Sequence, residues 1–494
     1  MVPGDGGSGI CRCPTALEAT GGGAEVMDLQ KRSCMKKQQG CRVALVLVVL
    51  AWLPVVASAG ESSPDPGNPV SMGLPSSDEV KAGAQAEEKE VVERAAVQPA
   101  PSSIQDILPT LRAKAEAGDA EAQRSLGFIY EKGKGVPRNP GEALKWYRKA
   151  ASRGDVRAQR ILGYMYYYGK GAPQNYSEAL LWYLKAAAQG NVDAQYNLGV
   201  MYQDGKGVAQ NYDEALQWYR KAADQGNTDA QNNMGNMYDH GRGVAQNHGE
   251  AMKWYRKAAD RGNATAQFNL GGMYLEGKGV TEDYAEAAKW YRKAADRGDT
   301  TAQYSLGLMC RLGKGVNQDD GKAVQWYRKA ADRGDASAQS SLGFMYHEGK
   351  GVAQNYGEAL KWYRKAADQG YAEAQNNLGV MYSNGKGVAQ SDDESLKWCR
   401  KAADQGYAEA QDSVGFKYEN GIAVAKDYAE AMRWYRKAAD QGNAEAQSHL
   451  AFMYEEGKGV PRNHGEALKW CRKAADQGDA YGKELLETLK ARQN

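Results

Sequence analysis

The stretch Asp119–Gly154, DAEAQRSLGFIYEKGKGVPRNPGEALKWYRKAASRG, decides the fold because the chain repeats it. Ten copies follow one another, each 36 residues after the last, with no insertion or deletion. The Ala-Gln pair shows this register, from Ala122-Gln123 to Ala446-Gln447. Self-similarity at a period between ~20 and ~50 residues is typical of solenoids and other repeat arrays.

Each copy predicts two helices. Ala122 and Leu126 belong to an apolar face with the period of a helix, and Gly133 ends that helix because glycine tolerates the left-handed conformation. Asn139 is expected to cap the second helix, with Glu142 placed to close a capping box. The second helix has its own apolar stripe, which consists of Ala143, Leu144, Trp146, Tyr147, Ala150 and Ala151.

This pattern resembles the Sel-1-like repeat family, a relative of tetratricopeptide arrays. The shared features are A-x-A-Q-x-x-L-G-x-x-Y, G-x-G-V and N-x-x-E-A-x-x-W-Y-x-K-A-A, as in Glu121–Ala151. The resemblance implies an all-α protein: a right-handed α/α superhelical solenoid of ten 36-residue helix-turn-helix repeats, with a capping helix at each end. It also implies a protein-binding scaffold rather than a catalyst. One branch of the family has cysteines in each repeat and reported penicillin-binding or weak β-lactamase activity, and this chain lacks those cysteines.

The chain is predicted to have three regions. Residues 1–59 contain an N-terminal extension and a signal peptide, and residues 60–103, rich in Pro, Ser, Ala and Glu, form a disordered linker. Residues 104–494 form the solenoid, with the repeats at 119–478 and a C-terminal capping helix at 479–492. Capping helices are needed because an inner repeat buries both of its faces.

The N-terminal region has the three parts of a secretory signal. A lysine pair follows Met35, Val43–Ala57 is an apolar core, and Ala57-Ser58-Ala59 is a small-x-small cleavage site. We therefore predict cleavage after Ala59 and export to the periplasm or the medium. The rival interpretation is a membrane anchor, but the apolar core is shorter than the ~20 residues that span a bilayer. Whether translation begins at Met1 or Met35 stays open.

Composition argues against several classes of function. The formal net charge is only +2 because many charges of opposite sign cancel, so no clustered basic surface for nucleic acid is predicted. The five histidines share no metal-ligand spacing, and no cofactor motif is present. Of the seven cysteines, only Cys310, Cys399 and Cys471 follow the predicted cleavage site. Each replaces a tyrosine of other copies. Cys399 and Cys471 occupy the same site two repeats apart, roughly 20 Å or more, which is beyond the ~7 Å Cα limit of a disulfide, so no disulfide is expected.

No catalytic residues are predicted. Ser383 and Lys386 match the S-x-x-K of penicillin-recognising enzymes, but the partner motifs S-D-N and K-T-G are absent. A hydrolase of that class remains the first rival to a protein-binding scaffold. The second rival is a cell-wall polysaccharide binder, whose exposed aromatic side chains would stack on sugars.

Partner specificity is expected where the copies differ, which in the first helix is at the equivalents of residues 124, 128 and 131. On a helical wheel these positions lie opposite Ala122, Leu126 and Ile129, so they are predicted to face water or a groove that binds a protein or peptide. The candidate partner-binding residues are Arg124, Phe128, Arg160, Tyr164, Tyr167, Tyr196, Phe268, Tyr304, Phe344, Phe416 and Phe452. The alternative is that stacking of repeats buries this row.

Charge along the same row changes from basic to acidic. Arg124 and Arg160 stand in the first copies, whereas Asp412, Glu419 and Glu455 stand in the last ones. This change suggests that a peptide partner could bind in one direction.

The second helix carries a row of Arg-Lys pairs near its end. Arg220 and Asp224 are predicted to form an i,i+4 ion pair that recurs in later copies. Leu184 replaces the arginine in the second copy, and Ala188 replaces the aspartate there. This joint loss favours a structural salt-bridge surface over a basic binding face. The ninth copy is the most irregular, because Gly421-Ile422-Ala423 replaces the usual Gly-x-Gly.

Overall fold

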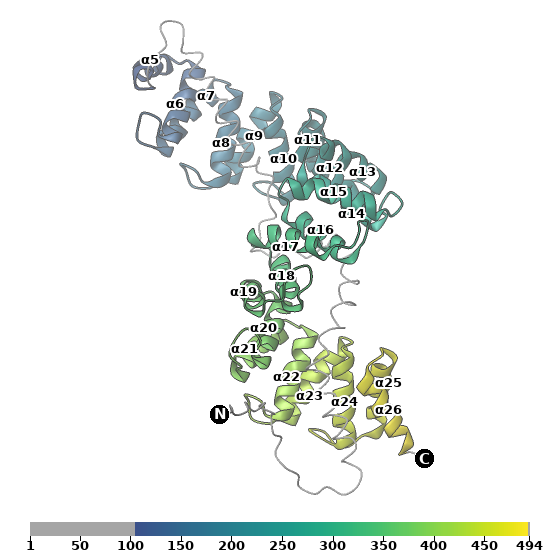
Figure 1. The fold of residues 1–494 in the computed structure, drawn as a ribbon. Helices are drawn as coiled ribbons and strands as arrows, with labels where there is room; N and C mark the ends of the chain where they lie inside the picture. Colours follow the sequence, from purple (N-terminus) through teal and green to yellow (C-terminus); the bar gives the residue numbers. More distant parts are fainter. Residues whose placement is uncertain (1–103, 493–494) are drawn as a thin grey trace, which may run out of the picture. The chain divides into compact units, whose positions relative to one another are not determined.

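The computed structural model describes residues 104–492, and within this range the chain is helical and contains no strand (Figure 1). The helices are α5 (Ile104–Glu116), α6 (Ala120–Lys132), α7 (Pro140–Ser152), α8 (Val156–Tyr168), α9 (Tyr176–Ala188), α10 (Val192–Asp204), α11 (Tyr212–Asp224), α12 (Thr228–His240), α13 (His248–Asp260), α14 (Ala264–Glu276), α15 (Tyr284–Asp296), α16 (Thr300–Leu312), α17 (Asp320–Asp332), α18 (Ala336–Glu348), α19 (Tyr356–Asp368), α20 (Ala372–Asn384), α21 (Asp392–Asp404), α22 (Ala408–Asn420), α23 (Tyr428–Asp440), α24 (Ala444–Glu456), α25 (His464–Asp476) and α26 (Ala480–Ala491). The prediction of an all-α solenoid of ten helix pairs is confirmed. The predicted signal peptide and linker lie outside the described residues.

The described helices form two compact units, residues 104–326 and residues 327–492, which divide within α17. From α5 to α16, and again from α18 to α26, each helix packs on the helix that follows it, as α6 does on α7 and α24 on α25. The first helices of neighbouring repeats also touch, as α8 and α10 do.

The first helix of each pair begins and ends where the sequence predicts. The Asp119 carboxylate accepts a hydrogen bond from the Ala122 N–H at 2.7 Å, which caps α6. Gly133, with φ +71°, ends α6 in the left-handed conformation, and its N–H donates to the carbonyl of Ile129.

The second helix has one of the two hydrogen bonds of a capping box. The side chain of Asn139 accepts from the Glu142 N–H at 3.0 Å, as predicted. The Asn139 N–H, however, donates to the carbonyl of Tyr130 at 2.8 Å, so it is not the partner of the Glu142 side chain. The predicted capping box is therefore wrong: Glu142 instead accepts from Lys145 at 2.5 Å. The bond to Tyr130 ties the loop to the first helix.

A glycine–tyrosine contact sets the spacing between the helices of a pair. A Cβ on Gly199 of α10 would lie 2.4 Å from the ring of Tyr219 on α11, so only glycine fits there. Tyr219 is fully buried by this contact. In the tenth repeat Ala451 replaces the glycine, and Cys471 replaces the tyrosine.

The second glycine of each Gly-x-Gly loop also packs closely. A Cβ on Gly207, which has φ +74°, would lie 2.5 Å from the carbonyl oxygen of Tyr176, at the start of the preceding second helix. Ala423 occupies the equivalent position in the ninth repeat with φ +59°, and it is the only non-glycine residue with positive φ among residues 104–492. The irregular loop therefore holds a strained backbone.

Capping helices close both ends, as predicted. Helix α5 buries Ala115 against a cluster of Ala122, Leu126 and Trp146. At the other end Leu485 and Leu489 of α26 are fully buried.

Candidate functional site on the first helices

We define the first-helix row as the residues at the equivalents of 124, 128 and 131. In the unit of residues 104–326, Phe128, Tyr167 and Tyr196 are buried, and Arg124, Arg160, Tyr164, Phe268 and Tyr304 are half-buried. In the unit of residues 327–492, Phe452 is buried, and Phe344 and Phe416 are half-buried. None of these side chains is fully exposed.

The expectation that this row faces away from the packed side is therefore wrong for its buried members. The Tyr196 ring lies 5.9 Å from the Tyr219 ring of the second helix, and Phe268 lies 5.2 Å from Tyr291 in the same way. A helical wheel shows one helix alone, so it omits these contacts with the second helix, which packs against the first. The half-buried members still reach the surface.

The two arginines of the row connect successive repeats. The Arg124 guanidinium lies 3.2 Å from the Asp155 carboxylate, which caps the next first helix. Arg160 lies 3.6 Å from Asp193. Their charges are thus shared with acids of the neighbouring repeat.

The most exposed aromatic group adjoins the row. Tyr168, the last residue of α8, is 37% exposed and is one of two exposed large hydrophobic side chains within residues 104–492. Its ring lies 4.6 Å from Tyr164 and 4.9 Å from Tyr167. Tyr167 in turn lies 5.1 Å from Tyr176 on α9. Sequence reasoning missed Tyr168, although the run of three tyrosines at 166–168 could have indicated it.

Two lysines lie on these rings. Lys170 donates to the Tyr164 hydroxyl at 2.6 Å, and its ammonium lies 4.5 Å from the Tyr164 ring centroid. Lys206 of the next repeat lies 5.6 Å from the Tyr167 centroid and 3.1 Å from Asp204. Burial raises the pKa of Tyr167 to about 12 despite the opposing effect of Lys206, so this phenol stays neutral at physiological pH.

The acidic end of the row is not a charged surface. In the unit of residues 327–492 the Asp412 carboxylate is buried and lies 2.7 Å from His449 Nδ1. Glu419 is buried too and accepts from the Tyr435 hydroxyl at 2.8 Å. Buried Glu455 pairs with Arg462 and His464. These carboxylates bind side chains of the array, which removes the basis for the predicted acidic end of a binding groove.

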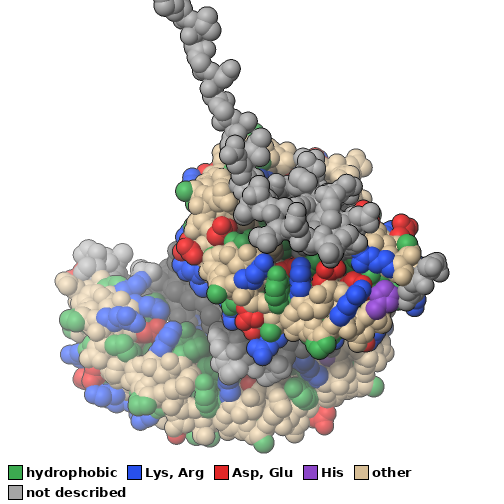
Figure 2. Space-filling view, turned by 90° about the horizontal axis from the view of Figure 1, so that it is seen from below, with side chains coloured by type: hydrophobic (Ala, Val, Ile, Leu, Met, Phe, Trp, Pro, Cys, Tyr) green, Lys and Arg blue, Asp and Glu red, His purple; other side chains and the backbone are tan. Residues whose placement is uncertain are grey.

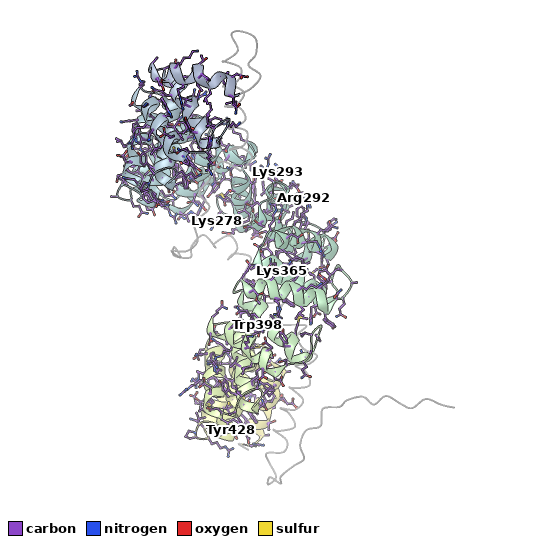
Figure 3. All side chains as sticks on the ribbon, turned by 90° about the vertical axis from the view of Figure 1, so that its left-hand side faces the viewer. Lys278, Arg292, Lys293, Lys365, Trp398 and Tyr428 are labelled. Carbon is purple, nitrogen blue, oxygen red and sulfur yellow. The ribbon has the colours of Figure 1, made fainter. Side chains whose placement is uncertain are left out.

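The basic row on the second helices joins repeats. Its arginine donates to the tyrosine hydroxyl of the next first helix in the pairs Arg112–Tyr130, Arg148–Tyr166, Arg220–Tyr238, Arg256–Tyr274, Arg328–Tyr346, Arg364–Tyr382, Arg400–Tyr418 and Arg436–Tyr454. The neighbouring lysine covers a tryptophan, as Lys293 does at 3.6 Å from the Trp290 centroid. Figure 3 labels Arg292 and Lys293 on α15 and Lys365 on α19. Within residues 104–492 the predicted i,i+4 ion pair forms between Arg400 and Asp404, at 3.5 Å, and not between Arg220 and Asp224, so it does not recur as predicted.

The one second helix that lacks the arginine, at Leu184, also indicates that the arginines have a structural role. Arg220 lies 4.9 Å from the Trp254 centroid, and Arg400 covers Trp434 in the same way. Where Leu184 replaces the arginine, the following tryptophan, Trp218, is half-buried rather than buried.

Ten consecutive segments of the chain match the Sel1 repeat model, from residues 120–155 to residues 444–479. The chain belongs to the Sel1 repeat family. Proteins of this family generally mediate protein–protein interactions and are typically not catalytic. The Sel1 array is similar to a crystal structure of a protective antigen with an SLR fold from uropathogenic Escherichia coli strains, at 36% identity and TM-score 0.54, over 78% of this chain and 90% of the other. A Sel1 repeat protein from Oxalobacter formigenes is 37% identical with TM-score 0.51, over 63% of this chain and 90% of the other. No protein of curated function matches.

Within residues 104–492, no group of three or more His, Cys, Asp and Glu side chains could hold a metal ion. None of the helices in that range is both long and apolar enough to cross a membrane. Lys386, the lysine of the S-x-x-K match, lies 5.3 Å from the Tyr356 ring centroid. It contacts an aromatic ring from a loop, as Lys170 does.

Proposed function

We propose that this Sel1 array is an exported, non-catalytic scaffold that binds a partner protein or peptide through its first-helix face, which would be the concave side of the solenoid. The observation that carries the proposal is the division of labour between positions. Residues that join helices recur in every unit, such as the alanines equivalent to Ala122, whereas residues of the first-helix row change from copy to copy. Stacking needs the same residues in every repeat, but recognition of an asymmetric partner needs different ones.

Export is supported by the lysines after Met35, the apolar core Val43–Ala57 and the site at Ala57-Ser58-Ala59. Charges that pair between neighbouring repeats, as Arg124 does with Asp155, also fit a scaffold. Figure 2 illustrates the charge balance: on the face it shows, Lys and Arg side chains lie among Asp and Glu side chains.

Site-specific photocrosslinking in the source cell tests the proposal. The crosslinker p-benzoylphenylalanine would replace Tyr164, Phe268 or Phe344 on first helices. The matched controls carry it at Leu181, Lys289 or Lys361, which are exposed on the second helices of the same repeats. Discrete adducts with one protein at first-helix positions, and not at the controls, are expected. Adducts confined to the second-helix positions would move the binding face and overturn the proposal.

Two assays address the rivals. Hydrolysis of nitrocefin by the purified mature protein would favour the hydrolase, and retention on peptidoglycan would favour the polysaccharide binder. We expect neither.

A further inference from the structure

The first-helix face of the first two repeats has a composition that the rest of the row lacks. We propose that Tyr164, Tyr168 and Lys170 form a docking site for an acidic peptide segment of the partner protein. This inference rests on the proposed function and specifies the chemistry of its partner.

The first argument is exposed aromatic area. Tyr168 is 37% exposed and is backed by the rings of Tyr164 and Tyr167, so a partner side chain would meet a preformed apolar surface. Tyrosine is enriched at the energetically dominant positions of interfaces, because it buries a large area with little loss of side-chain entropy. No other copy has a Tyr, Phe or Trp at the equivalent position, where the residues are Lys132, Asp204, His240, Glu276, Leu312, Glu348, Asn384, Asn420 and Glu456.

The second argument is the placement of the Lys170 ammonium group. Lys170 is held between two rings, at 4.5 Å from the Tyr164 centroid and 5.8 Å from the Tyr168 centroid. An ammonium group has three N–H donors, and the Tyr164 hydroxyl accepts one of them. A carboxylate placed beside Tyr168 could accept another. The lysine is thus fixed before binding, which lowers the entropy cost of an ion pair.

The third argument is local charge. The first two repeats, residues 119–190, contain twelve Lys and Arg residues and six Asp and Glu residues, although the whole chain has a net charge of only +2. Lysines of the first repeat also lie beside an aromatic ring: Lys132, the last residue of α6, and Lys134, in the loop that follows, lie 5.8 and 5.6 Å from the Phe128 centroid. An acidic segment is the complementary partner.

A single-stranded nucleic acid would also combine anionic and stacking groups, but the site fits it less well. Asp204 lies 3.1 Å from Lys206, and Asp193 lies 3.6 Å from Arg160. A phosphate backbone would need a continuous basic track, and these carboxylates interrupt it.

Fluorescence anisotropy with the mature full-length protein tests this inference. The probes are a labelled peptide of Glu interleaved with Leu and Phe, the same peptide with every Glu changed to Lys, and a labelled oligothymidylate. We expect only the acidic peptide to bind, and we expect Lys170→Glu or Tyr168→Ser to weaken it about tenfold each. Added salt should weaken the complex further.

Two control variants stand in the same region. Leu181→Ser removes the other exposed large hydrophobic side chain, which is 45% exposed, and Lys145→Glu makes the same charge change as Lys170→Glu on a second helix. Both should bind the acidic peptide as the unmodified protein does.

Equal binding of the acidic and lysine peptides, tighter binding of oligothymidylate, or equal losses in the controls would overturn the inference. Residues 87–90 of the chain, Glu-Glu-Lys-Glu, are themselves acidic. If the labelled acidic peptide bound several-fold more tightly after Glu87, Glu88 and Glu90 were changed to Gln, this segment would be the occupant and the inference would be overturned. The crosslinking at Phe268 and Phe344 separates the two proposals. Suppose that adducts form at these two positions and that the Lys170→Glu protein binds the acidic peptide with unaltered affinity. This result would support the proposed function and would contradict this inference alone.

Discussion

The glutamine of each Ala-Gln pair is buried, and in copies such as the third it connects three helices. Gln195 Nε2 donates to the Ala187 carbonyl of the preceding helix, and its Oε1 accepts from Gln225 at 2.7 Å. Gln231 makes the first bond, but Arg261 stands where its glutamine partner would be. Within residues 104–492, Gln231 Oε1 accepts no hydrogen bond. Arg261 therefore leaves the buried Oε1 of Gln231 without a donor.

Arg261→Gln should restore this bond and raise the free energy of unfolding by ~1 kcal/mol. The glutamine would also keep a bond like that of the Arg261 guanidinium with the Gly226 carbonyl, since Gln189 bonds Gly154 in the equivalent place. The reverse change, Gln225→Arg, should cost ~1–3 kcal/mol. Urea denaturation of both variants measures these effects, and a shift of the same sign in both would contradict the account.

At the scale of the element, the loop after α22 contains a strained residue that can be corrected. Ala423→Gly should stabilise the unit of residues 327–492 by ~1 kcal/mol, because glycine removes the cost of a left-handed alanine. Gly387→Ala in the preceding loop is the matched control. Its φ is +69°, and the added Cβ would lie 2.5 Å from the Tyr356 carbonyl oxygen, so it should destabilise. Hydrogen exchange of α22 and α23 measures the stability of both variants. Protection that is unchanged in both would contradict the claim that Ala423 is strained.

The same loop should be the first site of limited proteolysis within the array. Cleavage is expected near Gly421–Ala425, since opening this loop releases strain. Ala423→Gly should slow that cleavage. Cuts distributed evenly over all ten loops would count against a weak ninth repeat.

Helix α26 should loosen in acid. Burial alone would raise the pKa of Glu455, but hydrogen bonds from Arg462 and His464 hold it below the ordinary 4.5. A lowered pKa in the folded state means that the stabilisation is complete above pH 4.5 and is lost as the pH falls through the folded value. Arg492, at the end of α26, lies 3.9 Å from the same carboxylate.

Hydrogen exchange of α26 between pH 6 and pH 3, corrected for intrinsic rates, measures this loss. Glu455→Gln should show weaker protection at neutral pH and a smaller further loss in acid. An equal acid response in both proteins would show that another group is responsible.

At the scale of the whole molecule, the sequence predicts what each repeat does but not how side chains meet between helices. The period, the Asp119 and Asn139 caps and the terminal helices follow from local patterns and are confirmed. The burial of Tyr196 depends on Tyr219, a contact between helices that a single-helix wheel omits. The capping box failed for a similar reason, because the Asn139 N–H already bonds to the preceding helix. The exposed Tyr168 departs from the repeat pattern, so an analysis of recurring positions passes over it.

Export remains a prediction for the whole chain. Protein recovered outside the cytoplasm should begin at Gly60, immediately after the expected cleavage site. N-terminal sequencing measures this directly, and a soluble cytoplasmic pool that retains Met1 or Met35 would contradict it.

The central claim is that the first-helix face binds a partner and does more than pack the array. The most direct measurement compares the melting temperature and the amount of crosslinked partner for two variants. Tyr164→Ser/Tyr168→Ser changes half-buried and exposed rings, so it should keep its melting temperature and lose the partner. Trp182→Ala empties a buried site and should lose ~3–5 kcal/mol of stability. A double serine variant that unfolds as readily as Trp182→Ala, or that retains its partner in full, would contradict the account.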